Sequence, residues 1–178
     1  LQGKLNPQQA LKADLKQSLS EGLQVHLSAR DSHLVIAGKS QLIALTSSVT
    51  LNGSQLTGID LQADMAGNII KANGSLGVPE SQLQWQAELL NLAALGTQFS
   101  GQVHANGTVD GALDDLALHF KLLAEKLTLP GAIKAEKLDG QATLMAGDSG
   151  KLDAELLATG LQVAENPILD GNLSLQGT

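Results

Sequence analysis

The feature that most constrains this chain is the alternation of small or apolar residues with polar ones along most of its length. Residues 99–109, for example, carry a small or apolar residue at every odd position. Side chains at every second position of a strand point to the same side, so such a run predicts a strand with one apolar face. Asn-Gly or Asp-Gly pairs at 52–53, 73–74 and 110–111 are typical of tight hairpin turns. This spacing predicts about twelve antiparallel strands.

The apolar residues are aliphatic rather than aromatic. Hydrophobic residues make up 43% of the 178 residues, but aromatic residues only 2%, namely Trp85, Phe99 and Phe120. The core of a compact β-sandwich normally includes several large rings. The composition therefore favours a thin sheet with an aliphatic face.

Charge and cysteine content exclude several classes of function. The net charge is −7 and the basic residues are few and scattered, whereas a nucleic-acid footprint needs clustered Lys and Arg with exposed aromatics. We therefore predict no nucleic-acid partner. The absence of cysteine excludes disulfides and thiolate metal sites. No apolar run reaches the 18 or more residues of a membrane-spanning helix.

The stretch Gly147-Asp148-Ser149-Gly150 resembles the surroundings of a serine-protease nucleophile, and Gly150-Lys151 resembles part of a phosphate-binding loop. A nucleophilic serine needs a base within hydrogen-bond reach and donors for the oxyanion, and the sequence places none beside Ser149. The phosphate loop fails because Met145 and Leu152 stand where its first glycine and its Ser/Thr belong. Alternating runs flank the stretch, so we predict a hairpin turn.

The remaining polar residues show no catalytic, cofactor or metal pattern. A zinc site needs three or four convergent ligands, and the four histidines are scattered. The EF-hand spacing is absent around Asp114-Asp115. We therefore predict no cofactor, no metal and no enzymatic activity. Four N-x-[ST] sequons would accept glycans in a secreted eukaryotic chain, but Asn-Gly turn chemistry explains three of them: Asn52, Asn73, Asn106 and Asn172.

One helix is predicted near the start, over residues 6–21. Asn6 suits a helix cap, Pro7 suits the first helical position, and Gly22 suits the end. Leucines recur every four residues at 11, 15 and 19. This narrow stripe favours a helix that packs on its own sheet.

The second half of the chain contains an internal repeat. Residues 124–144 and 158–175 both read Ala-x-x-Leu-x-aliphatic, then a loop with proline, then Leu-Asp-Gly and more alternation. Repeats of roughly thirty residues imply stacked supersecondary units. The chain starts and stops within its pattern. We therefore expect residues 1–178 to be a single fragment of a longer β-repeat array, with strands over 23–177.

Residues 90–144 resemble the AsmA-like repeat superfamily, and within it the TamB family of the bacterial translocation and assembly module. The matching elements are Leu-x-Leu-Ala-Ala-Leu-Gly at 90–96, Ser-Gly-x-Val at 100–103 and Asp-Asp-Leu at 114–116. Ala-x-x-Leu at 124–127 follows, with a Leu-Asp-Gly at 138–140. The likeness covers about residues 83–177, with motifs that are degenerate.

The resemblance implies an elongated, curved antiparallel sheet that forms a trough or groove with an apolar interior. Together with the alternating runs and the helix predicted near the start, the expected fold is all-β with one short N-terminal helix. It implies a periplasmic segment of a protein anchored in the inner membrane outside this fragment. The implied partners are phospholipid or other acyl chains, outer-membrane protein clients, and an outer-membrane Omp85-type barrel (TamA) reached through the full-length protein. The implied role is lipid transport and outer-membrane biogenesis.

Two other interpretations stay open at this point. The chain is alternatively a chaperone-like scaffold that binds β-strands of outer-membrane proteins, because open sheets have exposed strand edges. It is also compatible with a closed β-domain whose apolar face is ordinary core, because alternation does not say what covers that face. If a groove exists, its predicted lining is Trp85, Phe99, Val103, Leu116, Leu118, Phe120, Leu127, Leu129, Leu138, Leu144, Leu156, Leu161, Val163, Leu173 and Leu175.

Overall fold

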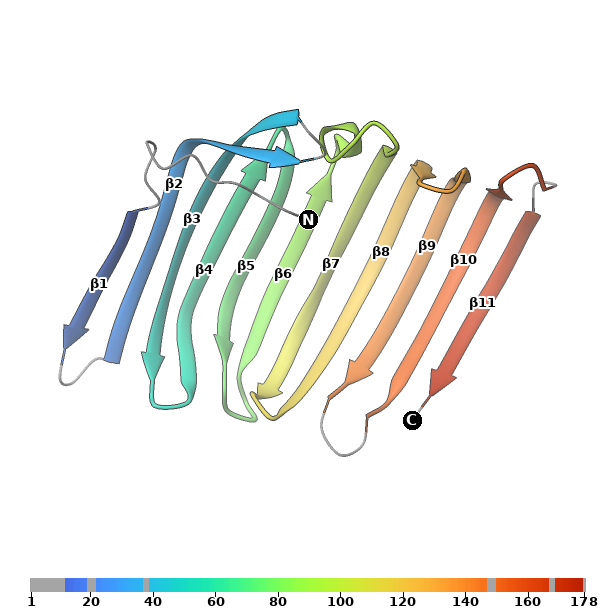
Figure 1. Ribbon diagram of the computed structural model, residues 1–178. Coiled ribbons are helices and arrows are strands. Elements are labelled where there is room, and N and C mark those ends of the chain that lie inside the picture. Colours follow the sequence, from blue (N-terminus) through green and yellow to red (C-terminus); the bar gives the residue numbers. More distant parts are fainter. Residues whose placement is uncertain (1–11, 19–21, 37–38, 147–149, 167–168, 178) are drawn as a thin grey trace.

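The computed structural model describes residues 12–18, 22–36, 39–146, 150–166 and 169–177. They form one open antiparallel sheet of eleven strands in chain order, with a single short helix, η1 (Figure 1). The all-β prediction is confirmed, with eleven described strands instead of about twelve. The elements are β1 Lys12–Ser18, β2 Gly22–Ile36, β3 Lys39–Asn52, β4 Gln55–Met65, β5 Asn68–Leu76, β6 Gln82–Leu89, η1 Leu92–Ala94, β7 Ser100–Ala112, β8 Asp115–Leu129, β9 Ile133–Met145, β10 Leu152–Val163 and β11 Leu169–Gly177.

Each strand pairs with the next one along the chain, so the sheet is a meander. Between β8 and β9 the register runs without a shift from Ala117↔Met145 to Leu129↔Ile133. Since paired residues of antiparallel strands project to the same side, a constant register carries the alternation of one strand onto its neighbour. The apolar positions of β8 and β9 therefore lie on one common face.

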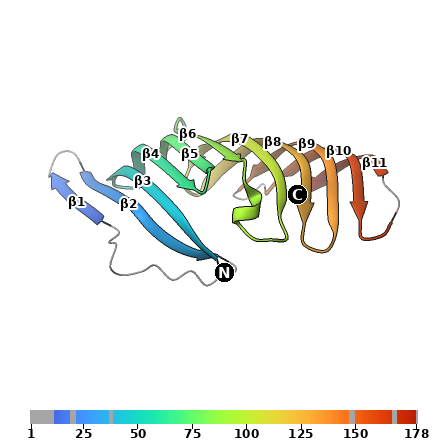
Figure 2. The same cartoon turned by 90° about the horizontal axis from the view of Figure 1, so that it is seen from above.

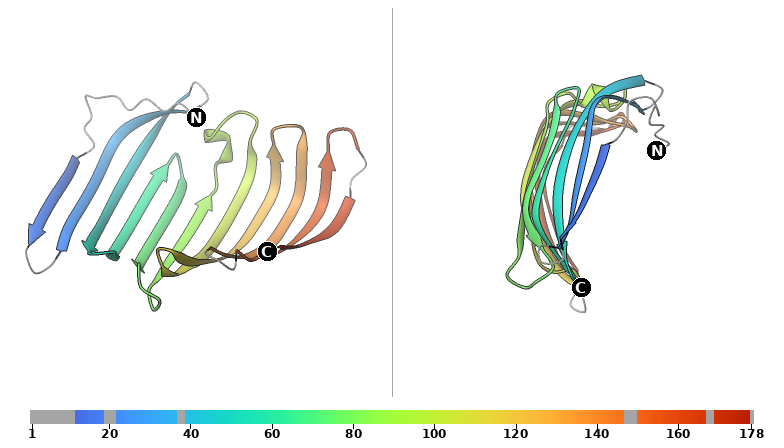
Figure 3. Two further views of the ribbon diagram at one scale, coloured as in Figure 1. Left: turned by 60° about the horizontal axis from the view of Figure 1, so that its bottom comes forward. Right: turned by 90° about the vertical axis from the view of Figure 1, so that its left-hand side faces the viewer.

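The sheet is a curved single layer. The strands bend at both ends toward the same side, and η1 lies on the concave side (Figures 2 and 3). No large side chain among the described residues is fully buried. The buried apolar residues of the described part are mostly alanines, as expected of a layer with little packed against it: Ala29, Leu92, Ala94, Ala124, Leu127, Ala135 and Ala158.

Strands β8 and β10 each contain an Ala-x-x-Leu sequence at which the alternation changes. In β8 it runs from Ala124, which is 1% exposed, to Leu127, which is 7% exposed, with two exposed residues between them. The second of these, Lys126, has φ +50°, and its equivalent in β10, Gly160, has φ +63°. A residue in the left-handed region shifts the alternation by one position and bends the strand. The repeat predicted from sequence therefore corresponds to two equivalent hairpins, β8–β9 and β10–β11.

The prediction of a helix over residues 6–21 is wrong for its central part. Residues Lys12–Ser18 form β1, which pairs with β2 from Lys12↔Ser28 to Ser18↔Gly22. The remainder of the predicted helix lies outside the described residues. A leucine spacing of four is a multiple of two, so the pattern fits a strand as well as a helix. Pairing with β2 then decides, because it satisfies the backbone of both strands.

The predicted turn around residues 147–150 is supported by its flanks. Leu144 pairs with Leu152, so β9 and β10 form an antiparallel hairpin across this stretch. The helix that a phosphate loop requires is replaced by β10. Residues 147–149 themselves lie outside the described part.

Among the described residues, no helix has the length and hydrophobicity of a membrane-spanning segment.

Candidate functional site: the apolar face of the sheet

The register separates the central strands into two chemically different faces. Trp85 of β6, Gly107 of β7, Phe120 of β8 and Ala142 of β9 are partners in one row across the sheet. We call the side that carries this row the apolar face. The row beside it on β7–β9, Thr108, His119 and Thr143, belongs to the opposite side, the polar face.

The structure places all fifteen predicted lining residues on the apolar face. Phe99, Leu127 and Leu129 reach it by packing with Ala124 beyond the bend. Val163 pairs with Ile133, which pairs with Leu129, and Leu161 lies beyond the same bend in β10, paired with Leu169 of β11. The others share the face through register with Phe120 or its neighbours: Trp85, Val103, Leu116, Leu118, Phe120, Leu138, Leu144, Leu156, Leu173 and Leu175.

Large apolar side chains are exposed toward the β11 side of this face. Leu144 of β9 is 44% exposed and Leu152 of β10, its direct partner, is 38% exposed. On β11, Leu173 and Leu175 are 52% and 50% exposed. These four leucines lie on three adjacent strands, so they form a continuous apolar patch that water reaches.

The two rings at the centre of the face form a pair. The ring centroids of Trp85 and Phe120 are 6.4 Å apart with an interplanar angle of 46°. Gly107 lies between them in register. A Cβ at Gly107 would overlap the His119 carbonyl oxygen and come within 2.9 Å of Phe120 Cα. Glycine is therefore required for β7 and β8 to approach each other beneath the rings.

The connection from β6 to β7 covers part of the apolar face. We call residues 90–99 the strap; it contains η1. Leu92 is 5% exposed and forms the buried cluster with Ala124 and Leu127. Around this cluster pack partly buried residues of the strap and of the neighbouring strands: Leu89, Leu95, Phe99, Val103, Leu129 and Leu138.

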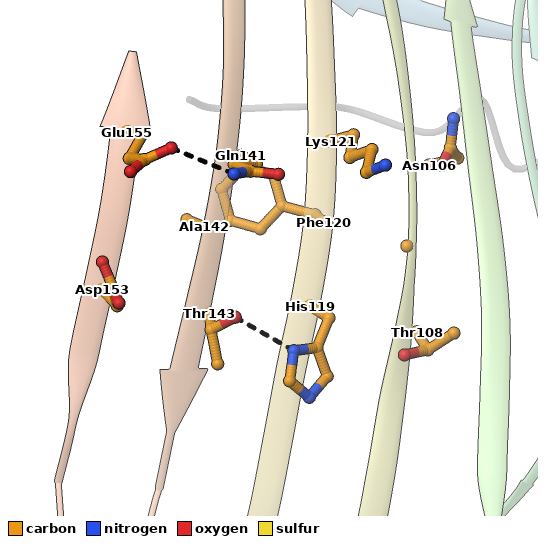
Figure 4. Close-up of a pocket in the computed structure, with 11 residues that line it drawn as sticks. Asn106, Thr108, His119, Phe120, Lys121, Gln141, Ala142, Thr143, Asp153 and Glu155 are labelled. Carbon is orange, nitrogen blue, oxygen red and sulfur yellow. Dashed lines mark hydrogen bonds between the residues drawn. The ribbon is translucent and has the colours of Figure 1, made fainter. Parts of the chain in front are cut away.

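A depression of the described surface lies on the polar face. It has a volume of about 460 Å³ and is open to solvent. Its residues appear in Figure 4 with β10 on the left and β7 on the right, the reverse of Figure 1, because the view is from the convex side. Its polar lining residues are Asn106, Thr108, His119, Lys121, Gln141, Thr143, Asp153 and Glu155.

The bonds in this depression are those of exposed side chains between strands. His119 Nδ1 lies 3.0 Å from Thr143 Oγ1, and Gln141 Nε2 donates to Glu155 Oε2 at 3.0 Å (Figure 4). A nucleophile would also need its base oriented by a third group and donors for an oxyanion. The bonds of the described residues supply no third group for His119. We therefore assign no reaction to the depression.

The described residues bring no three histidine or acidic side chains together as a metal site would. His26, His104 and His119 are exposed and alternate with the apolar-face positions of their strands. Asp114 and Asp115 are exposed at the reversal between β7 and β8. The three Asn-Gly asparagines, Asn52, Asn73 and Asn106, are exposed, but only Asn52 stands at a strand reversal.

The strap and its anchor, Asn68, are the features that sequence reasoning missed. Asn68 occupies an apolar-face position, because it pairs with Met65 and Leu89, yet it is a polar residue only 4% exposed. β6 ends at Leu89, and η1 begins at Leu92 after two intervening residues.

Comparison with known proteins identifies no relative of this chain. The chain matches no family model, no curated protein and no solved structure. The functional proposal therefore rests on the geometry of the apolar face.

Proposed function

We propose that this chain shields acyl chains from water on the concave, apolar side of its sheet, which serves as an open trough. The cargo is the tail region of phospholipids or of other acyl-bearing molecules. The strands form the ribs of the trough, and the cargo passes from strand to strand across them. The chain carries out no covalent chemistry in this account.

The observation that carries the proposal is the exposed leucine patch of β9, β10 and β11. Contiguous apolar surface on a soluble protein marks a site of interaction with a protein, a ligand or a membrane. The half-exposed Leu173 and Leu175 continue the face formed by Leu144 and Leu152. The face is aliphatic and broad, and it carries no constellation of polar groups, which suits a flexible hydrocarbon chain.

The energetics favour such a role. Exposing an acyl chain to water costs about 0.8 kcal/mol per CH₂ group, or roughly 10 kcal/mol for a typical tail. A continuous aliphatic surface removes much of this cost at each step of a passage. Because the chain has few aromatic rings, bulky side chains do not fill most of the apolar face. Trp85 and Phe120 at its centre are the exception.

A sealed β-domain is a poor fit to this arrangement. In a sandwich, a second sheet packs on the apolar face. Among the described residues, only the strap packs on the central apolar face, and it does so at one end of β7–β9. The opposite face is mostly polar, with Leu157 as a 54% exposed exception, and the chain carries a net charge of −7. Together these favour solubility with the apolar face still accessible.

The cellular setting is proposed from the AsmA-like resemblance of residues 90–144. It places the chain in the periplasm, as one segment of a TamB-like protein anchored in the inner membrane. Cargo then moves between the inner and outer membranes in support of outer-membrane biogenesis. In the full-length protein, a TamA-type barrel in the outer membrane is the expected partner.

Native mass spectrometry of the purified chain tests the proposal. We expect lipid to co-purify and to dissociate as acyl-bearing species. Leu144→Asp with Leu173→Asp introduces two charges on the exposed patch and should remove most of this lipid. Both side chains are about half exposed, so the fold tolerates the change.

The matched control carries the same kind of substitution on the opposite face, as Gln84→Asp with Asn172→Asp. Both residues are exposed, and neither faces an acidic partner, since Gln84 pairs with Asn73 and Thr108 and Asn172 pairs with Leu157. The control should retain its lipid. Equal lipid loss in both pairs, or no lipid on the wild-type chain, would contradict the proposal.

A further inference from the structure

Asn68 is the unusual residue of the apolar face. It is 4% exposed, and its partners in register are Met65 and Leu89. A buried amide costs free energy unless its donors and acceptor are satisfied. Its Nδ2 donates to Asn91 O at 2.9 Å, and its Oδ1 accepts from Asn91 N at 2.9 Å. A single side chain thus replaces a strand partner for the backbone of Asn91.

Asn91 is where the strap leaves the sheet. Its own side chain donates from Nδ2 to Ala66 O at 3.1 Å, so this residue holds the start of the strap to the β4–β5 turn and to β5. The other backbone bonds of the strap are local to it. They run from Ala94 N to Asn91 O, Leu95 N to Leu92 O, Gly96 N to Ala93 O, and Phe99 N to Gly96 O.

Beyond this amide clamp the strap is held to the sheet by apolar contacts. Leu92 sits against Ala124 and Leu127, and Leu95 and Phe99 pack around them. Ala124 and Leu127 belong to the same apolar face as Leu118 and Phe120. The strap therefore already occupies, with its own leucines, the kind of surface that the proposed function assigns to an acyl chain.

We propose that the strap is a tethered lid, which the Asn68–Asn91 clamp holds over one end of the apolar face and which sets where a guest lies. This inference rests on the proposed function. With the strap in place, a guest is confined to the part of the face that includes Leu118, Phe120 and Leu144. With the strap released, the surface around Leu127, Leu129 and Leu138 becomes available as well.

Hydrogen exchange tests the clamp. Asn68→Ala removes both bonds to the Asn91 backbone and should accelerate exchange of the Asn91, Ala94 and Leu95 amides by about tenfold. The control is Asn73→Ala, at an exposed position of the same strand. Asn68→Asp keeps the size and the acceptor but sets a carboxylate oxygen against Asn91 O, so it provides a second release variant if the alanine variant folds poorly.

A paramagnetic probe tests the lid. Stearic acid with a nitroxide near its methyl end broadens the NMR signals of leucine methyl groups that it approaches. In the wild-type chain we expect broadening at Leu118 and Leu144, with Leu127 and Leu129 remaining sharp. In Asn68→Ala, Leu127 and Leu129 should broaden too, and the Asn73→Ala chain should behave as the wild type does.

Several results would overturn the inference. The first is unchanged hydrogen exchange of the strap amides in both Asn68 variants. The second is a wild-type chain in which the Leu127 methyl signals broaden as much as those of Leu118. The third is a released strap with Leu127 and Leu129 signals that stay sharp. If no leucine broadens in any chain, the proposed function fails and the lid has no guest to direct. Broadening at Leu118 without any effect of strap release would refute the lid alone and leave the proposed function standing.

Discussion

The two sequence repeats of the second half adopt the same hairpin in different surroundings. In β8–β9, Ala124 and Leu127 lie under the strap and are 1% and 7% exposed. In β10–β11, Ala158 is still buried, but the equivalents of Leu127 and Leu138 are more exposed: Leu161 is half-buried and Leu169 is 60% exposed. The repeat thus determines the hairpin, the bend and the face to which the leucines point. Whether that face is covered depends on a distant segment, the strap.

This contrast separates two contributions to stability. The first repeat has a small core that the strap completes, and the second relies on strand pairing over an exposed apolar surface. Equivalent substitutions should therefore cost more in the first repeat and its neighbour β7 than in the second. Urea unfolding of each variant measures the difference in unfolding free energy, provided that the transition is two-state.

The largest contrast is expected for two glycines. Gly107→Ala should lower the unfolding free energy by about 3 kcal/mol, since its Cβ would overlap backbone atoms of β8. Gly171→Ala in β11 should change it by less than about 0.5 kcal/mol, because nothing lies within 4 Å of that position. Equal effects on the urea midpoint would refute the close approach of β7 and β8.

The leucines that end the two Ala-x-x-Leu bends should rank next. Leu127→Ala removes a side chain from the buried cluster and should cost about 2.5 kcal/mol. The equivalent Leu161→Ala, at a half-buried position, should cost about 1 kcal/mol. A larger cost at Leu161 than at Leu127 would mean that the strap does not complete a core.

Substitutions at the two bends should change the unfolding free energy in opposite directions. Lys126 has φ +50°, where a non-glycine residue is strained, so Lys126→Gly should raise the unfolding free energy by about 1 kcal/mol. Gly160→Ala places a Cβ 2.6 Å from Glu136 Cγ at φ +63° and should lower it by about 1.5 kcal/mol. Changes of the same sign in the two chains would show that the bends are not equivalent.

The smallest effect is expected at the bond that joins the two repeats on the polar face. Gln141 Nε2 donates to Glu155 Oε2 at 3.0 Å, and both side chains are exposed. Glu155→Gln should change the unfolding free energy by less than about 0.5 kcal/mol. The control is Glu165→Gln in the turn after β10. A loss above 1 kcal/mol at Glu155 alone would show that side chains of the polar face help to hold the repeats together.

Local sequence was sufficient to predict the strands and the shared face. The alternation in residues 99–109 specifies which side chains of β7 point to each side, and short hairpins transfer that choice to the neighbouring strand. The same reasoning failed for residues 12–18, because a leucine at every fourth position fits the strand period of two as well as the helix period of 3.6. Pairing with β2 is a tertiary contact that no local pattern reports.

The strap and the bends lay beyond local prediction for other reasons. Leu92 and Leu95 continue the apolar composition of their neighbours, and only the packing on Ala124 shows that they fold back onto the sheet. Lys126 is a residue type that rarely adopts positive φ. The only sequence signal for the positive φ of Lys126 is its alignment with Gly160 in the repeat. That signal could be interpreted only once the structure had shown that the two positions are equivalent.

Photo-crosslinking with a phospholipid that carries a diazirine in its acyl chain tests the central claim most directly, with adducts mapped by peptide mass spectrometry. The account predicts adducts at apolar-face residues of β8–β11, among them Leu118, Leu144 and Leu173, and few at His119, Thr143 or Ser174 one position away. Adducts distributed equally over the two faces, or their absence from the leucines, would contradict the claim that acyl chains lie on the apolar face.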